Sequence, residues 1–301
     1  MSYLKSFTFA SEAAEVDYIL SFPYKIEMQC YSNTNIYPFK VLPQKGVREL
    51  EFAPITILYG GNGSGKSTML NIIAEKLHLR RAAPFNNTPF FEEYLALCRY
   101  ELSPRVRGVP RDSAILTSDG VFDFLLDVRA INEGVDRRRE ELFEKYESVR
   151  PKNGYSDGFQ MRSLDDYEEL KLRNEIRHST KSAFATRHLP RELDGKSNGE
   201  SAFVYFTQKI GEHALYLLDE PENSLSARLQ GELRQFLEDS VRFYGCQFII
   251  STHSPFLLSM RDARIYDLDS VPVRERRWTE LENVRAYYDL FCQYRRDFEE
   301  N

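Results

Sequence analysis

The sequence has few cysteines, no long apolar run and no excess of positive charge. Its 4 cysteines lie far apart without a C-x-x-C pair, which argues against a disulfide framework or a zinc site and favours reduced thiols. Nowhere do about eighteen apolar residues run together, and residues 1–20 carry Glu12, Glu15 and Asp17. We therefore expect no signal peptide, no membrane insertion and a cytoplasmic location.

The net charge of -6 means that any contact with nucleic acid must come from a local patch of the surface. With 301 residues and 42% apolar content, the chain can bury a full core. We expect one domain over residues 1–301, with a charged helical arm or subdomain inserted at residues 132–191.

A glycine-rich segment is the strongest motif of the chain. The β-branched run at residues 55–59 leads into it, and helical apolar spacing follows over residues 69–79. A strand, a glycine loop and a helix with the pattern G-x-x-x-x-G-K-S form a phosphate-binding P-loop. Its residues are Gly60, Gly61, Asn62, Gly63, Ser64, Gly65, Lys66, Ser67 and Thr68.

Each part of this loop serves the binding of a nucleoside triphosphate such as ATP. Glycines let backbone N–H groups curl around phosphates, and the helix N-terminus adds a positive dipole. Lys66 is expected to neutralise phosphate oxygens, and Ser67 is expected to bind Mg²⁺.

A second apolar run, residues 214–218, reads as a buried parallel strand and ends in Asp219-Glu220. A carboxylate at the carboxyl end of a central strand lies beside the phosphates. Asp219 is therefore a candidate Mg²⁺ ligand together with Ser67, and Glu220 a candidate base that polarises the attacking water. Read alone, the Asp-Glu pair could also be an ordinary turn.

Two further segments are candidates for contacts with phosphate. The strand at residues 247–251 ends shortly before His253, at the sheet edge where α/β proteins bind ligands. Ser197, Gly199 and Glu200 precede a helix expected at residues 202–210 and form a second helix N-terminus suited to an anion. An ordinary N-cap by Ser197 or Ser201 is the alternative interpretation.

The remaining elements complete an α/β fold. We expect a central, mostly parallel sheet with flanking helices, and an N-terminal antiparallel β-subdomain with strands at residues 24–31 and 37–42. Tyr37 or Phe39 could stack on a base, but a core aromatic is favoured. Further expectations are a loop at 79–87, a helix at 90–102, a strand at 114–117 and a helix at 121–146. A helix at 279–298, capped by Thr279 and Glu282, should pack its aromatic side chains on the core.

The order of these motifs resembles the ATP-binding cassette ATPases: Walker A at Gly60 to Ser67, signature at Ser197 to Glu200, Walker B with catalytic glutamate at Leu217 to Glu220, and the switch histidine His253. The amino-acid sequences of the motifs resemble those of the soluble branch near RecF and SMC, whose members are often labelled AAA-family ATPases. Within this branch, the chain resembles small bacterial predicted ATPases.

This resemblance implies a P-loop NTPase fold of the ABC type and a head-to-tail homodimer that sandwiches two ATP molecules with Mg²⁺. Each site would join Lys66, Ser67, Asp219, Glu220 and His253 of one chain to Ser197 and Gly199 of the other. Two departures stand out: Asn198 replaces a signature glycine, so hydrolysis could be slow, and the Q-loop glutamine is absent after residue 117.

Three classes of function follow. The favoured one is an ATP-driven dimerising ATPase that acts on DNA or with an effector protein, in a DNA repair or phage defence type of role. The alternatives are a nucleotide-binding subunit of a membrane transporter and a non-hydrolysing switch module that binds ATP.

Overall fold

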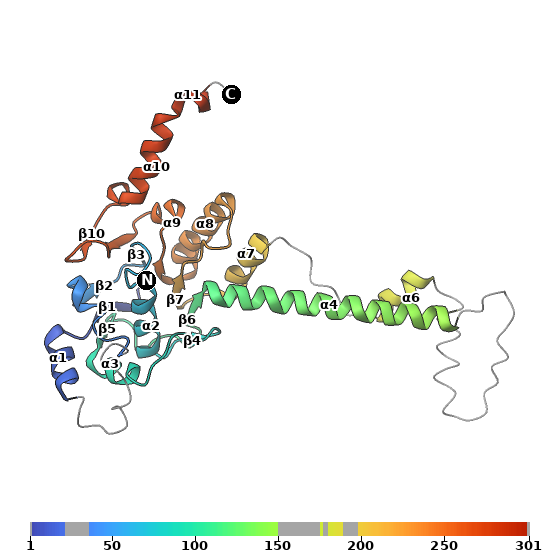
Figure 1. The fold of residues 1–301 in the computed structure, drawn as a ribbon, viewed down its shortest axis with the longest axis horizontal. Coiled ribbons are helices and arrows are strands. Elements are labelled where there is room, and N and C mark those ends of the chain that lie inside the picture. The colour runs from blue at the N-terminus through green and yellow to red at the C-terminus, as the bar shows by residue number, and fades with distance from the viewer. Residues whose placement is uncertain (1, 22–35, 150–174, 177–179, 189–197, 300–301) are drawn as a thin grey trace. The chain divides into compact units, whose positions relative to one another are not determined.

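The structure, a computed structural model, describes residues 2–21, 36–149, 175–176, 180–188 and 198–299. The chain divides into two compact units (Figure 1). The first contains residues 1–123 and 197–301, and the second contains residues 124–196. The expected strand at 24–31, Ser197 and most of the expected arm at 132–191 lie outside the described residues.

The first unit is built on a seven-stranded sheet in the order β10-β9-β3-β8-β7-β6-β4. All neighbouring strands are parallel except β10 and β9. The expected α/β class with a mostly parallel sheet is therefore confirmed. The strands are β3 (Ile55–Tyr59), β4 (Arg80–Arg81), β6 (Ala114–Thr117), β7 (Leu215–Asp219), β8 (Gln247–Ser251), β9 (Arg264–Asp267) and β10 (Arg274–Glu275).

The three middle strands bring the sequence motifs to one edge of the sheet. Strand β8 lies between β3 and β7, and all of its residues are buried, as are those of β3. Burial on both faces explains why these strands are continuous apolar runs. In the register, Ser251 is paired with Leu58 on one side and with Asp219 on the other, so the strands end together.

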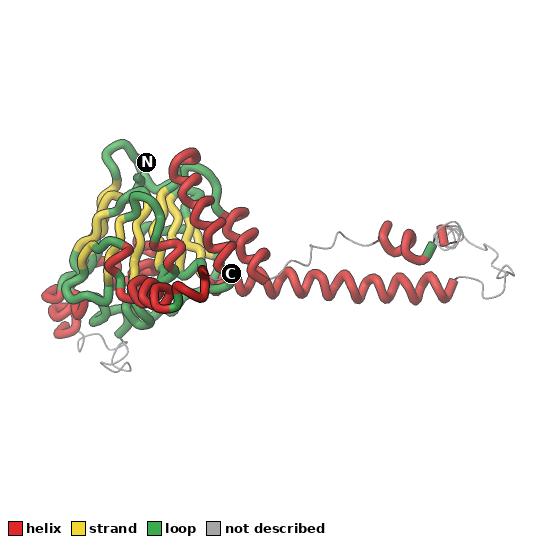
Figure 2. Tube along the Cα trace, turned by 90° about the horizontal axis from the view of Figure 1, so that it is seen from above, coloured by secondary structure: helices red, strands yellow, loops and turns green. Residues whose placement is uncertain are grey.

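Helices cover this sheet, which Figure 2 shows as a layer of neighbouring strands. Helix α2 (Lys66–Lys76) packs on β6, β7 and β8, and α8 (Ala227–Tyr244) also contacts β8. Helices α7 (Asn198–Lys209) and α9 (Pro255–Leu258) lie beside α8. The Ser226 side chain caps α8, and Gly245 ends it with a φ of 65°, which favours glycine.

A second, antiparallel sheet has the order β2-β1-β5. It consists of β1 (Leu4–Thr8), β2 (Glu49–Glu51) and β5 (Arg99–Leu102), and helix α1 (Glu12–Ser21) follows β1. An antiparallel sheet is thus present, but it is not built from the strands expected. The strand expected at residues 24–31 lies outside the described residues, and the prediction of a strand at residues 37–42 is wrong. That segment is a series of turns that buries Phe39 and Leu42, and Lys40 has a φ of 67°.

Two other local expectations are wrong for related reasons. The segment expected as one helix at 90–102 divides into α3 (Phe91–Leu97) and strand β5, because β5 pairs with the distant β1. The loop expected at 79–87 contains the short strand β4, which pairs with β6. Pairing with strands far along the chain overrides local spacing in both places.

The C-terminal segment also differs from the expected single helix. A short 3₁₀ turn, η5 (Trp278–Glu280), precedes α10 (Glu282–Gln293) and α11 (Arg295–Glu299). The expected cap by Thr279 and Glu282 is wrong, since the Glu280 carboxylate instead accepts a 3.3 Å hydrogen bond from the Arg277 N–H. The apolar side chains expected to pack on the core are exposed: Tyr287, Leu290, Phe291 and Tyr294.

The second unit contains most of α4 (Ser118–Val149) and α6 (Lys181–His188). Helix α4 extends the expected helix at both ends, so Asp119 lies in its first turn. Leu142 and Tyr146 form an apolar cluster with Ile176 and Phe184. The same unit also carries exposed ion pairs, such as the 2.8 Å pair of Arg138 with Glu141 on α4. No helix in the described part of the chain has the length and apolar character needed to cross a membrane.

Candidate functional site

The glycine-rich loop connects β3 to α2 and has the backbone that its sequence predicts. Gly63 and Gly65 have φ angles of 78° and 95°, in the left-handed region that favours glycine. The buried Lys66 turns its amine back onto the loop, where it donates to the carbonyls of Gly60 at 2.7 Å and Gly61 at 3.1 Å. The loop thus closes around its own lysine.

The first two glycines of the loop are in close contact with neighbouring side chains. A Cβ on Gly60 would lie 2.6 Å from Ser64 Oγ, so a larger residue would not fit there. The Gly61 N–H donates a 2.8 Å hydrogen bond to the Asp269 carboxylate. Asp269 follows β9, and its contact with a segment 208 residues away left no signal in the sequence.

Ser67 and Asp219 meet at the ends of α2 and β7. Ser67 Oγ donates to Asp219 Oδ1 at 3.0 Å, and the Ser251 hydroxyl also donates to that oxygen. Burial raises the pKa of the Asp219 carboxyl above its ordinary value, although the two hydroxyl hydrogen bonds lower it in part. The ends of α2 and β7 thus place a hydroxyl beside a carboxylate whose negative charge is disfavoured by burial.

This pair fits a magnesium ion. Mg²⁺ prefers hard oxygen ligands and is usually held by one or two protein groups plus substrate phosphates. Among the described residues there is no group of three or more His, Cys, Asp and Glu side chains that could form a metal cage. A site completed by phosphate oxygens is therefore the kind that Ser67 and Asp219 can form.

Glu220 lies beside the loop lysine. Its Oε1 is 3.5 Å from Lys66 Nζ, and its Oε2 accepts a 3.0 Å hydrogen bond from the Asn223 amide. The φ of Glu220 is 47°, which is unfavourable for a residue with a side chain, and its N–H is held by the Ser251 carbonyl at 3.0 Å. The hydrogen bond to β8 therefore holds the backbone of Glu220 in this strained conformation.

His253 follows β8, and its ring is 48% exposed. The buried carboxylate of Glu222 positions it, since Glu222 Oε1 accepts from the Thr252 hydroxyl at 2.6 Å and from the His253 N–H at 3.0 Å. On the other side, the Asn283 amide donates to the His253 carbonyl at 2.7 Å. Sequence reasoning missed Glu222 and Asn283, although Glu222 is a second carboxylate just after the Asp-Glu pair.

The signature residues are separate from the loop. A Cβ on Gly199 would lie 3.1 Å from the Ser224 carbonyl and 3.2 Å from the Leu229 side chain, in the segment that follows β7. Gly199 and Glu200 begin α7, and Ser197 lies outside the described residues. The structure thus brings Lys66, Ser67, Asp219 and Glu220 together, but it does not bring Gly199 to them.

The candidate base-stacking aromatics are part of the core and its edge. Phe39 is buried and packs against Tyr18 and Tyr94. The Tyr37 hydroxyl donates to the Thr68 hydroxyl at 3.1 Å, and its ring packs against Phe91. These contacts agree with the favoured interpretation of both as core aromatics.

Comparison with known proteins finds one family model. Residues 194–259 match the family described as "AAA domain, putative AbiEii toxin, Type IV TA system". This segment contains the signature residues, Asp219, Glu220 and His253. No curated protein matches the chain.

Solved structures with distant similarity include ATP-binding cassettes and an SMC head. An inward-facing putative metal-chelate type ABC transporter is 16% identical, with 78% of this chain and 77% of that one covered and a TM-score of 0.37. A dimeric ATP-binding cassette in a post-hydrolysis state with ADP and Pi is 17% identical, with 77% and 90% covered and a TM-score of 0.34. An SMC head bound to the C-winged helix domain of ScpA is 17% identical, with 79% and 94% covered and a TM-score of 0.38.

These TM-scores are below 0.5, so the fold assignment relies on the sheet order and on the P-loop between β3 and α2. The family match over residues 194–259 agrees with the resemblance stated from the sequence motifs. The chain has an α/β fold with a mostly parallel sheet and a P-loop between β3 and α2, and over residues 194–259 it is similar to the AAA-domain family.

Proposed function

We propose that this chain binds ATP with Mg²⁺, hydrolyses it, and works as an ATP-driven switch that closes as a head-to-tail homodimer and acts on DNA or with an effector protein. One observation carries the proposal. A P-loop lysine, a hydroxyl and two carboxylates meet at one sheet edge, with 3.0 Å between Ser67 Oγ and Asp219 Oδ1 and 3.5 Å between Lys66 Nζ and Glu220 Oε1. These groups suit phosphoryl transfer to water.

The roles of the residues follow from their positions. Ser67 and Asp219 would hold Mg²⁺, which neutralises charge on the phosphates of the bound nucleotide. Lys66 now contacts loop carbonyls and Glu220, and a triphosphate in the loop would offer its amine more negative oxygens. Glu220 would then be released from this ion pair and could accept a proton from the attacking water.

The position of Gly199 supports the need for a second chain. Its nearest neighbours are Ser224 and Leu229, not the loop, so the α7 N-terminus of the same chain does not complete the phosphate site. The α7 N-terminus of a partner would add N–H groups and a positive dipole to the terminal phosphate. ATP would thereby favour the closed dimer, and hydrolysis would release it.

The experiment is steady-state ATP hydrolysis with Mg²⁺, with mass followed by light scattering. We expect Glu220→Gln to lose at least about 100-fold in turnover and to accumulate as a dimer with ATP. Glu212→Gln is the matched control, because Glu212 is an exposed carboxylate just before β7, at the opposite end of that strand from Asp219. If Glu220→Gln turned over ATP like the wild type, the catalytic assignment would be wrong.

A non-hydrolysing switch is the second candidate, because Asn198 replaces a glycine of the usual signature. A side chain at this helix N-terminus changes how closely phosphate can approach. Tight ATP binding and ATP-dependent dimers without turnover in the wild type would favour this candidate.

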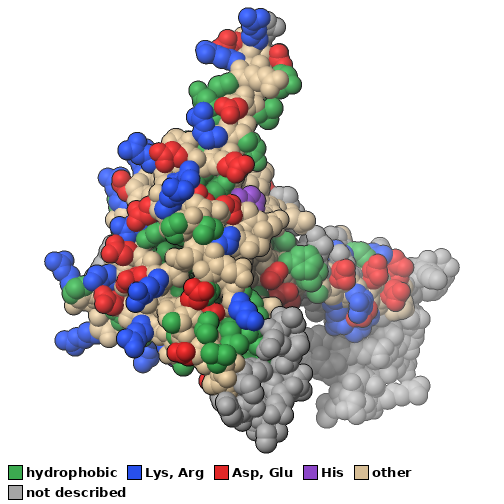
Figure 3. All heavy atoms as spheres, turned by 60° about the vertical axis from the view of Figure 1, so that its left-hand side comes forward, with side chains coloured by type: hydrophobic (Ala, Val, Ile, Leu, Met, Phe, Trp, Pro, Cys, Tyr) green, Lys and Arg blue, Asp and Glu red, His purple; other side chains and the backbone are tan. Residues whose placement is uncertain are grey.

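DNA and a protein effector remain the two partner classes. On the face in Figure 3, basic and acidic side chains are interspersed, without one extended patch of a single sign. A DNA-binding role needs a basic patch and a strong dependence on salt. Hydrolysis should therefore be measured with and without linear double-stranded DNA at two salt concentrations. Salt-sensitive stimulation supports DNA, and no response supports an effector protein.

A further inference from the structure

The C-terminal helices expose an apolar stripe that the nucleotide site does not use. Tyr287, Phe291, Tyr294 and Phe298 are 47%, 55%, 48% and 66% exposed. With the buried Val284, they are spaced three and four residues apart in alternation. This spacing is typical of a helix that packs along another helix. We call these four exposed residues the C-terminal seam.

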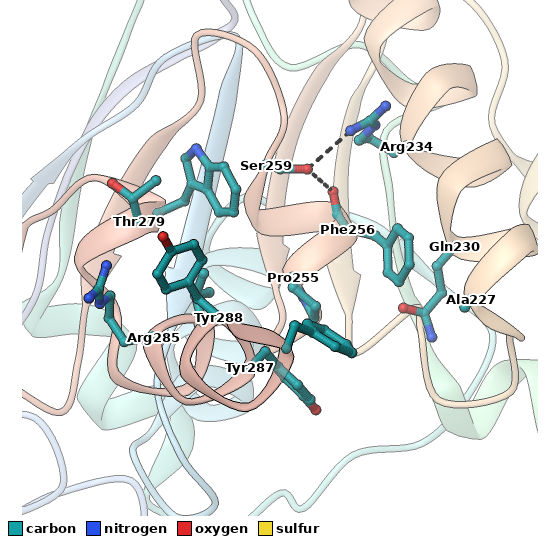
Figure 4. A pocket seen from close by; sticks show the side chains of 13 residues that line it. Ala227, Gln230, Arg234, Pro255, Phe256, Ser259, Thr279, Arg285, Tyr287 and Tyr288 are labelled. Atoms are coloured by element: carbon teal, nitrogen blue, oxygen red, sulfur yellow. Dashed lines mark hydrogen bonds between the residues drawn. The ribbon is translucent and has the colours of Figure 1, made fainter. Parts of the chain in front are cut away.

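Two of the seam residues, Tyr287 and Phe291, form one wall of a cleft in the first unit (Figure 4). The cleft has a volume of about 820 Å³ and lies between α10, α9 and the start of α8. Aromatic and apolar side chains dominate its lining, including Pro255, Phe256, Trp278, Tyr287, Tyr288 and Phe291. Such a cleft can accept the apolar face of a helix.

The other two seam residues, Tyr294 and Phe298, do not line the cleft. Helices α10 and α11 extend away from the sheet in Figure 1. Among the described residues, the one ring contact of Phe298 is with Phe291, and the two ring centroids are 5.9 Å apart. One chain therefore carries both an apolar cleft and an apolar helix end.

We propose that the cleft of one copy of this chain accepts the α11 end of a second copy, and the reverse, in an antiparallel two-fold dimer. The same surface then serves as cleft and as guest on both copies, as an isologous interface requires. A seam of this length is too short to pair stably on its own, so the cleft walls from α9 and α8 are needed as well.

Charge complementarity supports this occupant. The charged residues that line the cleft are Arg234 and Arg285, and none of its described lining residues is Asp or Glu. Arg285 lies 3.8 Å from Asp289 of its own helix, which leaves Arg234 as the arginine for a docked carboxylate. Arg234 Nη1 donates to Ser259 Oγ at 3.1 Å, but its buried Nε has no hydrogen-bond partner among the described residues. On α11, Glu299 pairs with Arg295 at 2.6 Å, so the carboxylate that a docked helix end would bring to Arg234 is that of Asp297, next to Phe298.

The exposed aromatic area approaches that of a standard interface. Large aromatic side chains bury about 150–250 Å² each when fully covered, so the half-exposed rings of the seam and cleft offer roughly 700 Å² per copy. A standard stable interface buries about 800 Å² per partner. The proposal goes beyond the nucleotide switch, because this contact needs no ATP.

The test is light scattering of the full chain without nucleotide over a range of concentrations. We expect a concentration-dependent dimer for the wild type. Phe291→Glu and Tyr294→Glu should each raise the apparent dissociation constant at least about tenfold. Gln293→Glu adds the same charge at an exposed α10 position outside the seam and should leave the dimer intact. All substituted side chains are exposed, and thermal melting checks that each variant folds.

A charge swap tests the orientation of the two helices. Asp297→Arg should weaken the dimer, and adding Arg234→Asp in the same chain should restore it at least in part. A wild type that is monomeric at tens of micromolar overturns the second copy as the occupant. A dimer that survives both seam variants overturns the location.

The nucleotide switch can fail or hold independently. Lys66→Ala should abolish ATP binding and leave the C-terminal dimer unchanged. In the Phe291→Glu background, Glu220→Gln with ATP should still form the nucleotide-dependent dimer. Loss of one dimer without the other therefore identifies which proposal is wrong.

Discussion

The side-chain amide of Asn283 donates a 2.7 Å hydrogen bond to the backbone carbonyl of His253. This bond joins the first turn of α10 to the loop after β8. The Asn283 N–H also donates to the Tyr59 hydroxyl at 3.3 Å, at the end of the strand that leads into the P-loop. The C-terminal helix is thus attached to two segments of the candidate site.

We predict that Asn283→Ala lowers ATP turnover about three- to tenfold while ATP affinity changes little. The physical reason is that the His253 loop loses a bond that fixes its carbonyl, whereas the P-loop keeps its contacts. The free energy of unfolding should fall by about 1 kcal/mol, the usual worth of one hydrogen bond. Turnover and nucleotide binding are measured side by side.

Gln293→Ala is the control, because it removes an exposed amide from the same helix. Equal losses in both variants would mean that α10 acts only through its general stability, and not through the bond to His253.

A second prediction concerns Glu222, whose buried carboxylate accepts from Thr252 and from the His253 N–H. Glu222→Ala should lower the free energy of unfolding by about 2–3 kcal/mol, because it leaves a buried hydroxyl and an N–H without their acceptor. Urea unfolding measures this loss. Glu232→Ala serves as the control, since its 3.6 Å pair with Arg228 is on the surface and should contribute less than about 1 kcal/mol.

The parts of the fold that could be predicted from the sequence are those whose signals are local. Strands β3, β7 and β8 each contain a run of mostly apolar residues because both faces of the sheet are covered. The P-loop needs glycines at positive φ, and Gly63 and Gly65 supply them. Since parallel strands end at one sheet edge, the meeting of Ser67 with Asp219 followed from these assignments.

The parts that could not be predicted depend on distant contacts. Strand β5 exists because it pairs with β1, about ninety residues earlier in the chain. The roles of Glu222 and Asn283 come from contacts with His253, which is 31 and 30 residues away. The spacing of the C-terminal aromatics predicts an amphipathic helix, but a pattern within one helix does not tell what covers its apolar face.

A third prediction uses two glycines in neighbouring helices. Gly199→Ala should lower the free energy of unfolding by about 1–2 kcal/mol, because its Cβ would press on the backbone carbonyl of Ser224 and on Leu229. Gly231, inside α8, has no atom within 4 Å of the added Cβ. Gly231→Ala should therefore raise stability by about 0.5–1 kcal/mol. A thermal shift of the same sign in both variants would contradict the packing described for Gly199.

The last prediction concerns the charge of Asp219. Burial raises the pKa of this carboxyl in the folded chain above the value of 3.8 that applies to the unfolded chain. As the pH rises above 3.8, the unfolded state therefore ionises first. The group then subtracts from the free energy of unfolding, and the subtraction is complete once the pH exceeds the raised value.

Asp219→Asn removes this cost, so the nucleotide-free variant should melt higher than the wild type at neutral pH. The difference should shrink as the pH falls and vanish below 3.8, where the carboxyl is protonated in both the folded and the unfolded chain. Asp112→Asn is the control, because Asp112 is 78% exposed in a surface pair with Arg80. With Mg²⁺ and ATP the order should reverse: the wild type gains stability from its ligand, whereas the variant lacks the carboxylate proposed to hold the metal. A variant that melts lower than the wild type without nucleotide would show that the hydroxyl hydrogen bonds of Asp219 outweigh the cost of burying its charge.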